Sequence, residues 1–371
     1  MTVMNSFVCR TCGTHYPLDT REWLCSCGGF FELLFRPEFD PAHIEPLAPG
    51  LWRYRALLPL HPDWEPVALG EGNTPLLELD WRGRRIRAKL ESLAPTGSFK
   101  DRGAAVLVTA LRGLGVRRVV EDSSGNAGAS LAAYAGKAGI ACEVCVPSTA
   151  AAPKLAQIAT YGAEVIEIRG RREYAALAAW AAAAHGVYYA SRLYNPFFQV
   201  GVETLAFELW EQLGRRAPGA LLLPVGSGTL LLGTYSGFVR LHEAGLVDRV
   251  PRIYGVQAAA CAPIYKAFVD GDDSAAEVEP EPTVATGIAV RRPVLGTQIL
   301  MAVRQTDGAI LSVTEDQIEA TRNQMAREGL HVEETSAAAV AALPEIEDPR
   351  QGDEPFVVVL TGHGLKTHRC E

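Results

Sequence analysis

Short apolar runs alternate with helical patterns through the middle of the chain, between residues 116 and 257. The runs that suit strands cover residues 143–146, 164–168, 187–190, 221–225 and 253–256. Strands separated by helices pair in parallel through βαβ crossovers, which place helices on both faces of the sheet. The alternation therefore predicts an α/β fold with mostly parallel sheets.

Length and charge narrow the class of protein. The chain has 371 residues and a formal net charge of −8 at pH 7. One hydrophobic core stops growing at roughly 250–300 residues, so we expect two lobes and a small appendage. The acidic charge argues against nucleic acid or a membrane as the main partner. Residues 1–10 lack a secretory-signal pattern, and the alanine-rich stretch 174–190 suits a packed helix and strand, so we expect a cytoplasmic protein.

One lysine, Lys100, stands among small and polar residues in the stretch 95–103, just before an apolar helical run. Lysine forms a Schiff base with an aldehyde when its amine can lose a proton, which desolvation or a neighbouring cation such as Arg102 promotes. The alternative is a helix-start lysine, capped by Ser98 and exposed to water. Signals elsewhere in the chain are needed to choose between the two.

Two glycine-rich turns, at residues 123–130 and 224–229, each follow an apolar run and open a helical one. A strand, a tight turn and a helix N-terminus together present backbone N–H groups to an anion. Glycine also serves such turns without any ligand, and Ser123 and Ser124 also suit simple N-capping. We interpret the second turn as a phosphate cradle.

These features resemble the fold-type II pyridoxal-phosphate enzymes, and the threonine synthase family most closely. The resemblance extends to Gly-Glu-Gly-Asn-Thr-Pro-Leu at 70–76, Val-Glu-Glu-Thr-Ser-Ala-Ala-Ala at 332–339 and Thr-Gly-His-Gly-Leu-Lys at 361–366. It implies a tryptophan synthase β-like fold of two lobes and a bound pyridoxal 5'-phosphate. By the same analogy we expect a homodimer.

The resemblance assigns roles residue by residue. It implies that Lys100 binds the cofactor's aldehyde and moves protons at the substrate's α and β carbons, that Asn126 hydrogen-bonds the phenolic oxygen, and that Thr361 meets the ring nitrogen. His363, beside Thr361, either orients a turn or acts as acid or base. It implies that the cofactor's phosphate is bound by Gly226, Ser227, Gly228 and Thr229. It implies that the substrate is bound by Ser123, Ser124, Gly125, Ala127 and Phe198.

Three positions depart from the threonine synthase pattern. Ala127 stands where a threonine is expected, Phe198 where an arginine is expected and Glu203 where a lysine is expected. A charge-assisted hydrogen bond contributes about 1.5–3 kcal/mol, so losing the guanidinium weakens phosphate binding. Glu203 repels a phosphate dianion if it faces the site, whereas Arg192 can supply a cation from a shifted position.

The resemblance implies that the enzyme converts O-phosphohomoserine and water to threonine and phosphate, first by elimination and then by replacement. If the missing phosphate anchors are not replaced, the alternative is β-elimination or β-replacement on another amino acid, in the manner of a serine/threonine dehydratase or a cysteate synthase. A third possibility is a non-catalytic homologue that only binds pyridoxal phosphate. Retention of Lys100, Asn126 and Thr361 argues against the third.

Cysteines near the N-terminus form a separate signal. Cys9 and Cys12 are followed by Cys25 and Cys27, within a segment too short to bury a core. Four thiolates from two close pairs suit a tetrahedral structural zinc site, and the alternatives are reduced or disulfide-paired cysteines. The other Cys-x-x-Cys pair, at 142 and 145, lies in a strand pattern and is predicted to be core.

The predicted organisation combines these signals. Residues 1–40 form a zinc-ribbon-like segment and residues 41–371 form the catalytic region. Within that region a smaller lobe covers roughly residues 104–190, and a larger lobe contains the rest.

Overall fold

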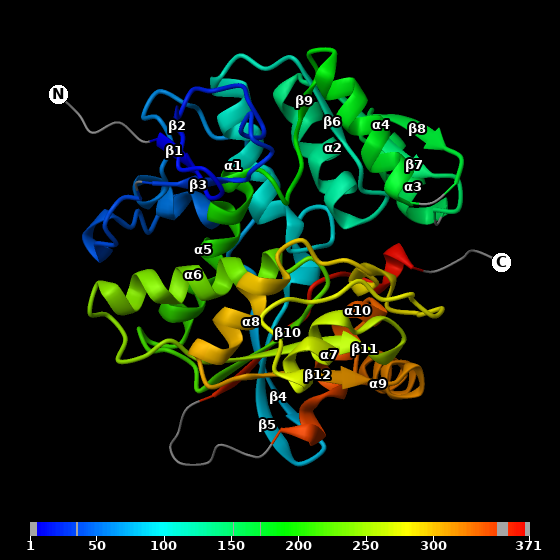
Figure 1. The fold of residues 1–371 in the computed structure, drawn as a ribbon. Coiled ribbons are helices and arrows are strands. Elements are labelled where there is room, and N and C mark those ends of the chain that lie inside the picture. Colours follow the sequence, from blue (N-terminus) through cyan, green and yellow to red (C-terminus); the bar gives the residue numbers. More distant parts are fainter. Residues whose placement is uncertain (1–5, 35, 151, 171, 347–354, 368–371) are drawn as a thin grey trace. The chain divides into compact units, whose positions relative to one another are not determined.

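A computed structural model describes residues 6–34, 36–150, 152–170, 172–346 and 355–367 of the chain (Figure 1). The chain divides into two compact units. The first unit comprises Met1–Gly72 and Lys100–Val202, and the second comprises Asn73–Phe99 and Glu203–Glu371.

The first unit contains a four-stranded sheet in the order β8-β7-β6-β9, with every neighbouring pair parallel. Its strands are β6 (Arg118–Glu121), β7 (Ala141–Pro147), β8 (Glu164–Ile168) and β9 (Tyr188–Tyr189). The crossovers are helices α2 (Asn126–Ala138), α3 (Ala152–Thr160) and α4 (Arg172–Ala184), and α1 (Lys100–Gly113) packs against α2. Each strand therefore feeds a loop and a helix at its carboxyl end.

The N-terminal part of the first unit is a small antiparallel sheet in the order β2-β1-β3. It is formed by β1 (Ser6–Cys9), β2 (His15–Pro17) and β3 (Phe31–Leu33), and the rings of Phe7 and Phe31 stack at 5.6 Å. Two short 3-10 helices follow, η1 (Pro41–His43) and η2 (Gly50–Leu57). Such short strands supply little core of their own.

The second unit contains a six-stranded sheet in the order β12-β11-β10-β13-β5-β4. All neighbouring pairs are parallel except the edge pair β4 and β5. Its strands are β4 (Leu76–Trp81), β5 (Arg84–Lys89), β10 (Ala220–Pro224), β11 (Arg252–Ala258), β12 (Ala309–Val313) and β13 (Phe356–Val359).

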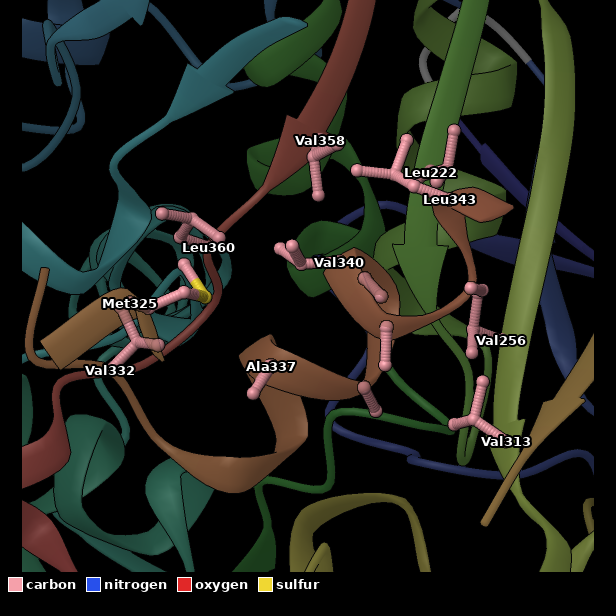
Figure 2. Packing of buried hydrophobic residues seen from close by; sticks show 14 of the residues in the cluster. Leu222, Val256, Val313, Met325, Val332, Ala337, Val340, Leu343, Val358 and Leu360 are labelled. Atoms are coloured by element: carbon pink, nitrogen blue, oxygen red, sulfur yellow. The ribbon is translucent and has the colours of Figure 1, made fainter. Parts of the chain in front are cut away.

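Helices pack around this sheet. They are α6 (Thr229–Glu243), α7 (Pro263–Asp270), α8 (Gly296–Gln305), α9 (Glu315–Arg327) and α10 (Glu334–Ala341), while α5 (Pro196–Gln212) begins in the first unit and ends in the second. Figure 2 shows Ala337 and Val340 of α10 in one cluster with Val358 and Leu222 of the sheet and Leu360 just after β13, all fully buried. This packing holds α10 against β10, β11 and β13.

The prediction of a mixed α/β fold with mostly parallel sheets is confirmed. The helices after both glycine-rich turns begin earlier than the apolar pattern indicates, at Asn126 and at Thr229, because the turn residues themselves enter the first helical turn. Cys142 and Cys145 are buried strand residues, as predicted. The boundaries at residue 40 and at 104–190 stay predictions. Among the described residues, no helix is both long and apolar enough to cross a bilayer.

Candidate functional site

Three loops of the second unit meet at one edge of its sheet. Strands β5, β13 and β10 are parallel neighbours, with Val359 beside Lys89 and Val358 beside Leu222. Parallel neighbours end at the same edge, which is where ligands bind in open α/β sheets. The glycine-rich turn 225–228 and the C-terminal stretch 360–366 follow two of these strands directly, and the loop 94–99 hydrogen-bonds to the second of them.

The turn between β10 and α6 has no room for side chains at two positions. A Cβ atom on Gly226 would lie 2.9 Å from Cα of Ile288. Gly228 has φ +88°, and a Cβ atom there would lie 2.4 Å from Ile299. Gly228 precedes α6 as its N-cap without a side-chain hydrogen bond to the helix. The amide groups of this helix N-terminus can therefore bind an anion.

Thr361 lies just beyond β13 and is 3% exposed. Its Oγ1 lies 3.1 Å from Oγ of Ser336, in the first turn of α10. The backbone N–H of Gly362 donates to Oγ of Ser336 at 3.0 Å. The Thr361 hydroxyl thus belongs to a buried hydrogen-bonded chain that is anchored on the backbone.

The C-terminal stretch also holds the loop that precedes Lys100. The N–H of Phe99 donates to the carbonyl of Thr361 at 3.1 Å, and the N–H of His363 donates to the carbonyl of Gly97 at 3.0 Å. Nζ of Lys366 donates to the carbonyl of Thr96 at 2.7 Å. The Thr-Gly-His-Gly-Leu-Lys signature therefore fixes residues 96–99, and Lys100 is the next residue in the chain.

His363 has a local structural task. Its Nδ1 accepts a hydrogen bond from the N–H of Leu365 at 3.2 Å and so caps η7 (Gly364–Lys366). Its ring also lies 5.7 Å from that of His331. These contacts favour the first of the two predicted roles, orientation of the turn.

In the first unit, Lys100 begins α1 and Asn126 begins α2. Oγ of Ser130, one turn into α2, donates to Oδ1 of Asp101 at 2.6 Å, and both residues are fully buried. This hydrogen bond ties the first turn of α1 to the first turns of α2. The structure therefore brings the helix starts that carry Lys100 and Asn126 together.

The turn before α2 is also built around glycine. A Cβ atom on Gly128 would lie 2.0 Å from the carbonyl oxygen of Ser123, so the turn folds tightly over the helix. Oγ of Ser123 accepts from the N–H of Gly125 at 3.4 Å, a long contact, and Gly125 precedes α2 as its N-cap without a side-chain hydrogen bond to the helix. Ser123 and Ala127 are buried, and Ser124 is half-buried. This second helix N-terminus is likewise suited to an anion such as a carboxylate.

Phe198 packs against the beginning of α1. Its ring is 3% exposed, and a Cβ atom on Gly103 would lie 2.6 Å from three of its ring atoms. One turn further along α5, a Cβ atom on Gly201 would lie 2.1 Å from the carbonyl oxygen of Arg102. Phe198 therefore fills the contact between α1 and α5 and brings no hydrogen-bond donor.

Glu203 lies in the second unit and is paired there. Its Oε2 lies 3.1 Å from Nη1 of Arg240 on α6, and Oγ of Ser236 donates to its Oε1 at 3.0 Å. Glu203 is fully buried and Arg240 is 7% exposed. The carboxylate that replaces the expected lysine is therefore neutralised by a cation of the same unit.

Arg192 is engaged in the first unit. Its Nη1 lies 3.1 Å from Oε1 of Glu121, the last residue of β6. Burial, helped by the neighbouring Asp122, raises the pKa of Glu121 to about 8 although Arg192 opposes the shift. Arg192 thus lies at the carboxyl edge of the smaller sheet with its charge shared with Glu121.

The four N-terminal cysteines converge. The sulfur atoms of Cys9, Cys12, Cys25 and Cys27 all lie within 4.8 Å of one another, and two pairs are 3.5 Å apart. A zinc ion with Zn–S bonds of about 2.3 Å requires sulfur atoms about 3.8 Å apart at the corners of a tetrahedron. The N–H of Cys27 and the hydroxyl of Tyr16 lower the pKa of Cys25 to about 6. The cluster can therefore hold a metal ion.

Comparison with known proteins identifies the family. A family model described as pyridoxal-phosphate dependent enzyme matches residues 67–362, which include both glycine-rich turns, the loop 94–99 with Lys100, and Thr361. The chain belongs to this family. It is thus a pyridoxal-phosphate dependent enzyme, as the sequence motifs predict.

Relatives within this enzyme family refine the class. The threonine synthases of Methanosarcina acetivorans and Methanocaldococcus jannaschii are each 36% identical to the chain, and each alignment covers 96% of the chain. The alignments cover 91% of the first relative and 92% of the second. The threonine synthase of Mycobacterium tuberculosis is 39% identical over 84% of the chain and 87% of its own length. The predicted resemblance is confirmed, and the enzyme is a threonine synthase-like lyase.

Solved structures agree on the fold of this pyridoxal-phosphate enzyme. The structure of a threonine deaminase from T.th. has a TM-score of 0.67 and 28% identity to this chain; the alignment covers 78% of this chain and 92% of the deaminase chain. The structure of maize serine racemase has a TM-score of 0.68 and 20% identity; the alignment covers 78% of this chain and 88% of the racemase chain. The prediction of a fold-type II architecture is confirmed.

Several residues of the site carry no clear signal in the sequence. Ser336 lies inside a motif that resembles the family, but only its contact with Thr361 singles it out. Lys366 closes another motif, and its amine is committed to a backbone carbonyl. The partner of Glu203 is 37 residues away, at Arg240. The one signal in the sequence is that this arginine directly follows the apolar helical run 230–239.

Proposed function

We propose that the enzyme converts O-phosphohomoserine and water to threonine and inorganic phosphate. The observation that carries this proposal is the match of threonine synthases over 96% of the chain. The site geometry supports it, because both units place uncapped helix N-termini and buried hydroxyl groups at the carboxyl edges of parallel sheets. When bound, pyridoxal phosphate withdraws electrons from the amino acid's α carbon.

The second unit fits the cofactor at two points. The cradle at Gly226, Ser227, Gly228 and Thr229 leaves no space for a side chain at two of its glycines and ends on an uncapped helix N-terminus. We propose that its N–H groups hold the cofactor's phosphate. Thr361 is buried at the same edge of the sheet. We propose that its hydroxyl hydrogen-bonds the ring nitrogen.

The first unit provides the groups that handle the substrate. We propose that Lys100 holds the cofactor's aldehyde carbon covalently and then carries protons at the substrate's α and β carbons. Asn126 hydrogen-bonds the phenolic oxygen. The substrate's α-carboxylate binds to Ser123, Ser124 and the amides around Gly125. The positive end of α2 favours that negative charge. Ala127, which is 5% exposed, offers no side-chain hydrogen bond to the substrate.

Two of the departures from the threonine synthase pattern have different consequences for phosphate binding. Glu203 is neutralised by Arg240, so it does not oppose a phosphate dianion. Phe198 is packed on Gly103 and supplies no donor in place of arginine. The loss at Phe198 favours the second candidate function, β-elimination or β-replacement on serine, threonine or a related amino acid.

A substrate panel distinguishes the two candidates. We expect the holoenzyme to release phosphate from O-phosphohomoserine at a kcat/KM at least about tenfold above that for forming 2-oxo acids from serine or threonine, a difference that one charged hydrogen bond can supply. Coupled assays of phosphate and of 2-oxo acid on the same preparation measure both rates. If 2-oxo acid from serine or threonine dominates, the enzyme is a dehydratase instead.

We also propose that Cys9, Cys12, Cys25 and Cys27 bind one structural zinc ion. All four ligands are sulfur atoms, which leaves no open position for water or substrate. A bound cation takes thiolates as ligands, so zinc binding displaces the protons of these thiols. Such thiolates must stay reduced, which suits the cytoplasm as the compartment of the enzyme.

Metal analysis checks the zinc proposal. The purified chain is expected to contain one zinc ion, and Cys9→Ser is expected to lose most of it, whereas Cys142→Ser, which changes a buried cysteine outside the cluster, retains it. Binding displaces protons from the thiols, so the affinity should fall as the pH is lowered. Elemental analysis after dialysis at pH 7.5 and at pH 5 measures the zinc that each variant retains. Equal zinc in both cysteine variants would exclude the site.

The homodimer also stays a proposal. Tyr265 and Val269 of α7 and Met301 of the adjacent α8 are exposed apolar side chains of the second unit. An exposed apolar patch of this kind suits association with another protein surface. Sedimentation of the holoenzyme measures the mass directly, and a monomer at micromolar concentration would refute the homodimer.

A further inference from the structure

Arg192 carries a buried guanidinium whose hydrogen-bonding capacity is largely unused. Its side chain is 9% exposed, and among the described residues its one hydrogen bond runs from Nη1 to Oε1 of Glu121 at 3.1 Å. A guanidinium has five N–H donors, so four of them find no acceptor in the described part of the chain. The fully buried atoms that lack a hydrogen bond include Oε2 of Glu121 but neither Nε nor Nη2 of Arg192. Solvent therefore reaches these two nitrogen atoms, and an acceptor from outside the protein can bind them.

The fold places Arg192 at the edge of the smaller sheet where ligands bind in α/β proteins. Strand β9 runs parallel beside β6, and the N–H of Ala190 extends this pairing by donating to the carbonyl of Val120 at 2.9 Å. Arg192 therefore follows the carboxyl end of β9, next to the strand that leads into the turn at Ser123. Glu121 ends β6 two residues before Ser123, so its contact with Arg192 joins the two segments.

The pair of Arg192 and Glu121 differs from an ion pair that serves only the fold. A buried ion pair stabilises a protein when further hydrogen bonds satisfy both partners. Glu203 meets this condition, because one carboxylate oxygen accepts from Arg240 and the other from a serine hydroxyl. Oε2 of Glu121 has no donor, and burial raises the pKa of Glu121 to about 8, so this carboxyl readily takes up a proton near neutral pH. An anion from outside can therefore compete with Glu121 for Arg192.

We propose that Arg192 binds a second anionic group at the far end of the substrate's side chain, such as a phosphate, and so determines substrate specificity. This inference rests on the proposed function, which places the α-carboxylate at the turn that begins at Ser123. A substrate held there presents its side chain beside the loop that follows β9. The planar guanidinium matches two oxygen atoms of a phosphate. The donor that is missing at Phe198 is then supplied six positions earlier in the chain.

Equilibrium binding to the holoenzyme tests this role without loss of phosphate. The two ligands are norvaline and its 5-phosphono derivative, in which a carbon atom replaces the ester oxygen of O-phosphohomoserine. Isothermal titration calorimetry gives both dissociation constants, and their ratio isolates the contribution of the phosphonate. We expect the unmodified enzyme to prefer the phosphonate by more than about tenfold. Arg192→Gln should reduce this preference about tenfold, which corresponds to the loss of one charged hydrogen bond.

Three further variants complete the experiment. Arg192→Lys retains a cation without the planar donor pair and should keep part of the preference. Glu121→Gln removes the competing carboxylate and should raise the preference. Arg118→Gln changes another arginine of the same sheet, which begins β6 and pairs with Glu143 at 2.6 Å, and should leave the preference unchanged.

The outcomes separate this inference from the proposed function. Equal binding of both ligands by the unmodified enzyme would overturn the inference, even if Arg192→Gln fails to fold. An unchanged preference in folded Arg192→Gln would overturn it too, as would an equal loss for both ligands, because Arg192 would then act on the α-carboxylate or on the fold. If O-phosphohomoserine is not turned over but the preference falls as expected, the role of Arg192 stands and only the proposed reaction is wrong.

Discussion

Lys100→Ala abolishes catalysis, with an expected loss in kcat of about 10³-fold, within the range for removing a positioned proton-transfer group. No other change in the chain should have a larger effect on the reaction, because this lysine is proposed both to hold the cofactor and to carry protons at two carbons. The variant should still fold, since Lys100 is the half-buried first residue of α1 and not part of its packed face.

A chemical readout accompanies the rate. Borohydride reduction makes a covalent link between lysine and pyridoxal phosphate permanent, so peptide mass spectrometry should find the cofactor on Lys100 in the unmodified enzyme. Lys137→Ala, at an exposed position on α2, serves as the control and should retain full activity. Recovery of the cofactor on any other lysine would refute the assignment of Lys100.

Glu203→Lys destabilises the protein by about 3–5 kcal/mol, as expected when a buried ion pair is broken and its partner charge is left unpaired. The substitution restores the residue of the threonine synthase pattern, yet it places two cations together because Arg240 lies 3.1 Å from the present carboxylate. A Cβ atom on Gly237 would lie 2.6 Å from the carbonyl oxygen of Glu203, so α5 and α6 lie too close there to move apart easily. Urea unfolding of the holoenzyme measures the loss.

Two further variants sharpen this result. Glu319→Lys makes the same charge change at an exposed position on α9 and should alter stability by less than about 0.5 kcal/mol. The swap Glu203→Lys with Arg240→Glu should recover part of the loss, since it restores opposite charges. If Glu203→Lys is instead as stable as the unmodified enzyme and gains activity, the carboxylate faces the substrate after all.

Local patterns in the sequence predicted the features that depend on neighbouring residues. The glycine-rich turns before α2 and α6 could be placed because strand, glycine and helix follow one another within a few residues. The cysteine cluster was recognisable for the same reason, from two close pairs in one short segment. In each case the physical requirement, a tight turn or a set of thiolates, is met within one stretch of chain.

Features that depend on distant residues could not be predicted in this way. The neutralisation of Glu203 requires Arg240 on the next helix, and no periodicity links the two positions. The role of Thr-Gly-His-Gly-Leu-Lys in clamping the loop before Lys100 requires the pairing of β13 with β5, two strands from opposite ends of the chain. Phe198 was expected at the substrate, and its contact with Gly103 emerges only from the packing of α5 on α1.

The most direct test of the account is the stoichiometry of products from O-phosphohomoserine with purified holoenzyme. We predict equal amounts of inorganic phosphate and threonine, measured by a phosphate assay and by chromatography of the same reaction. Phosphate accompanied by a 2-oxo acid instead of threonine would contradict the proposed addition of water at the β carbon. No phosphate at all would show that the loss of the donor at Phe198 has changed the substrate.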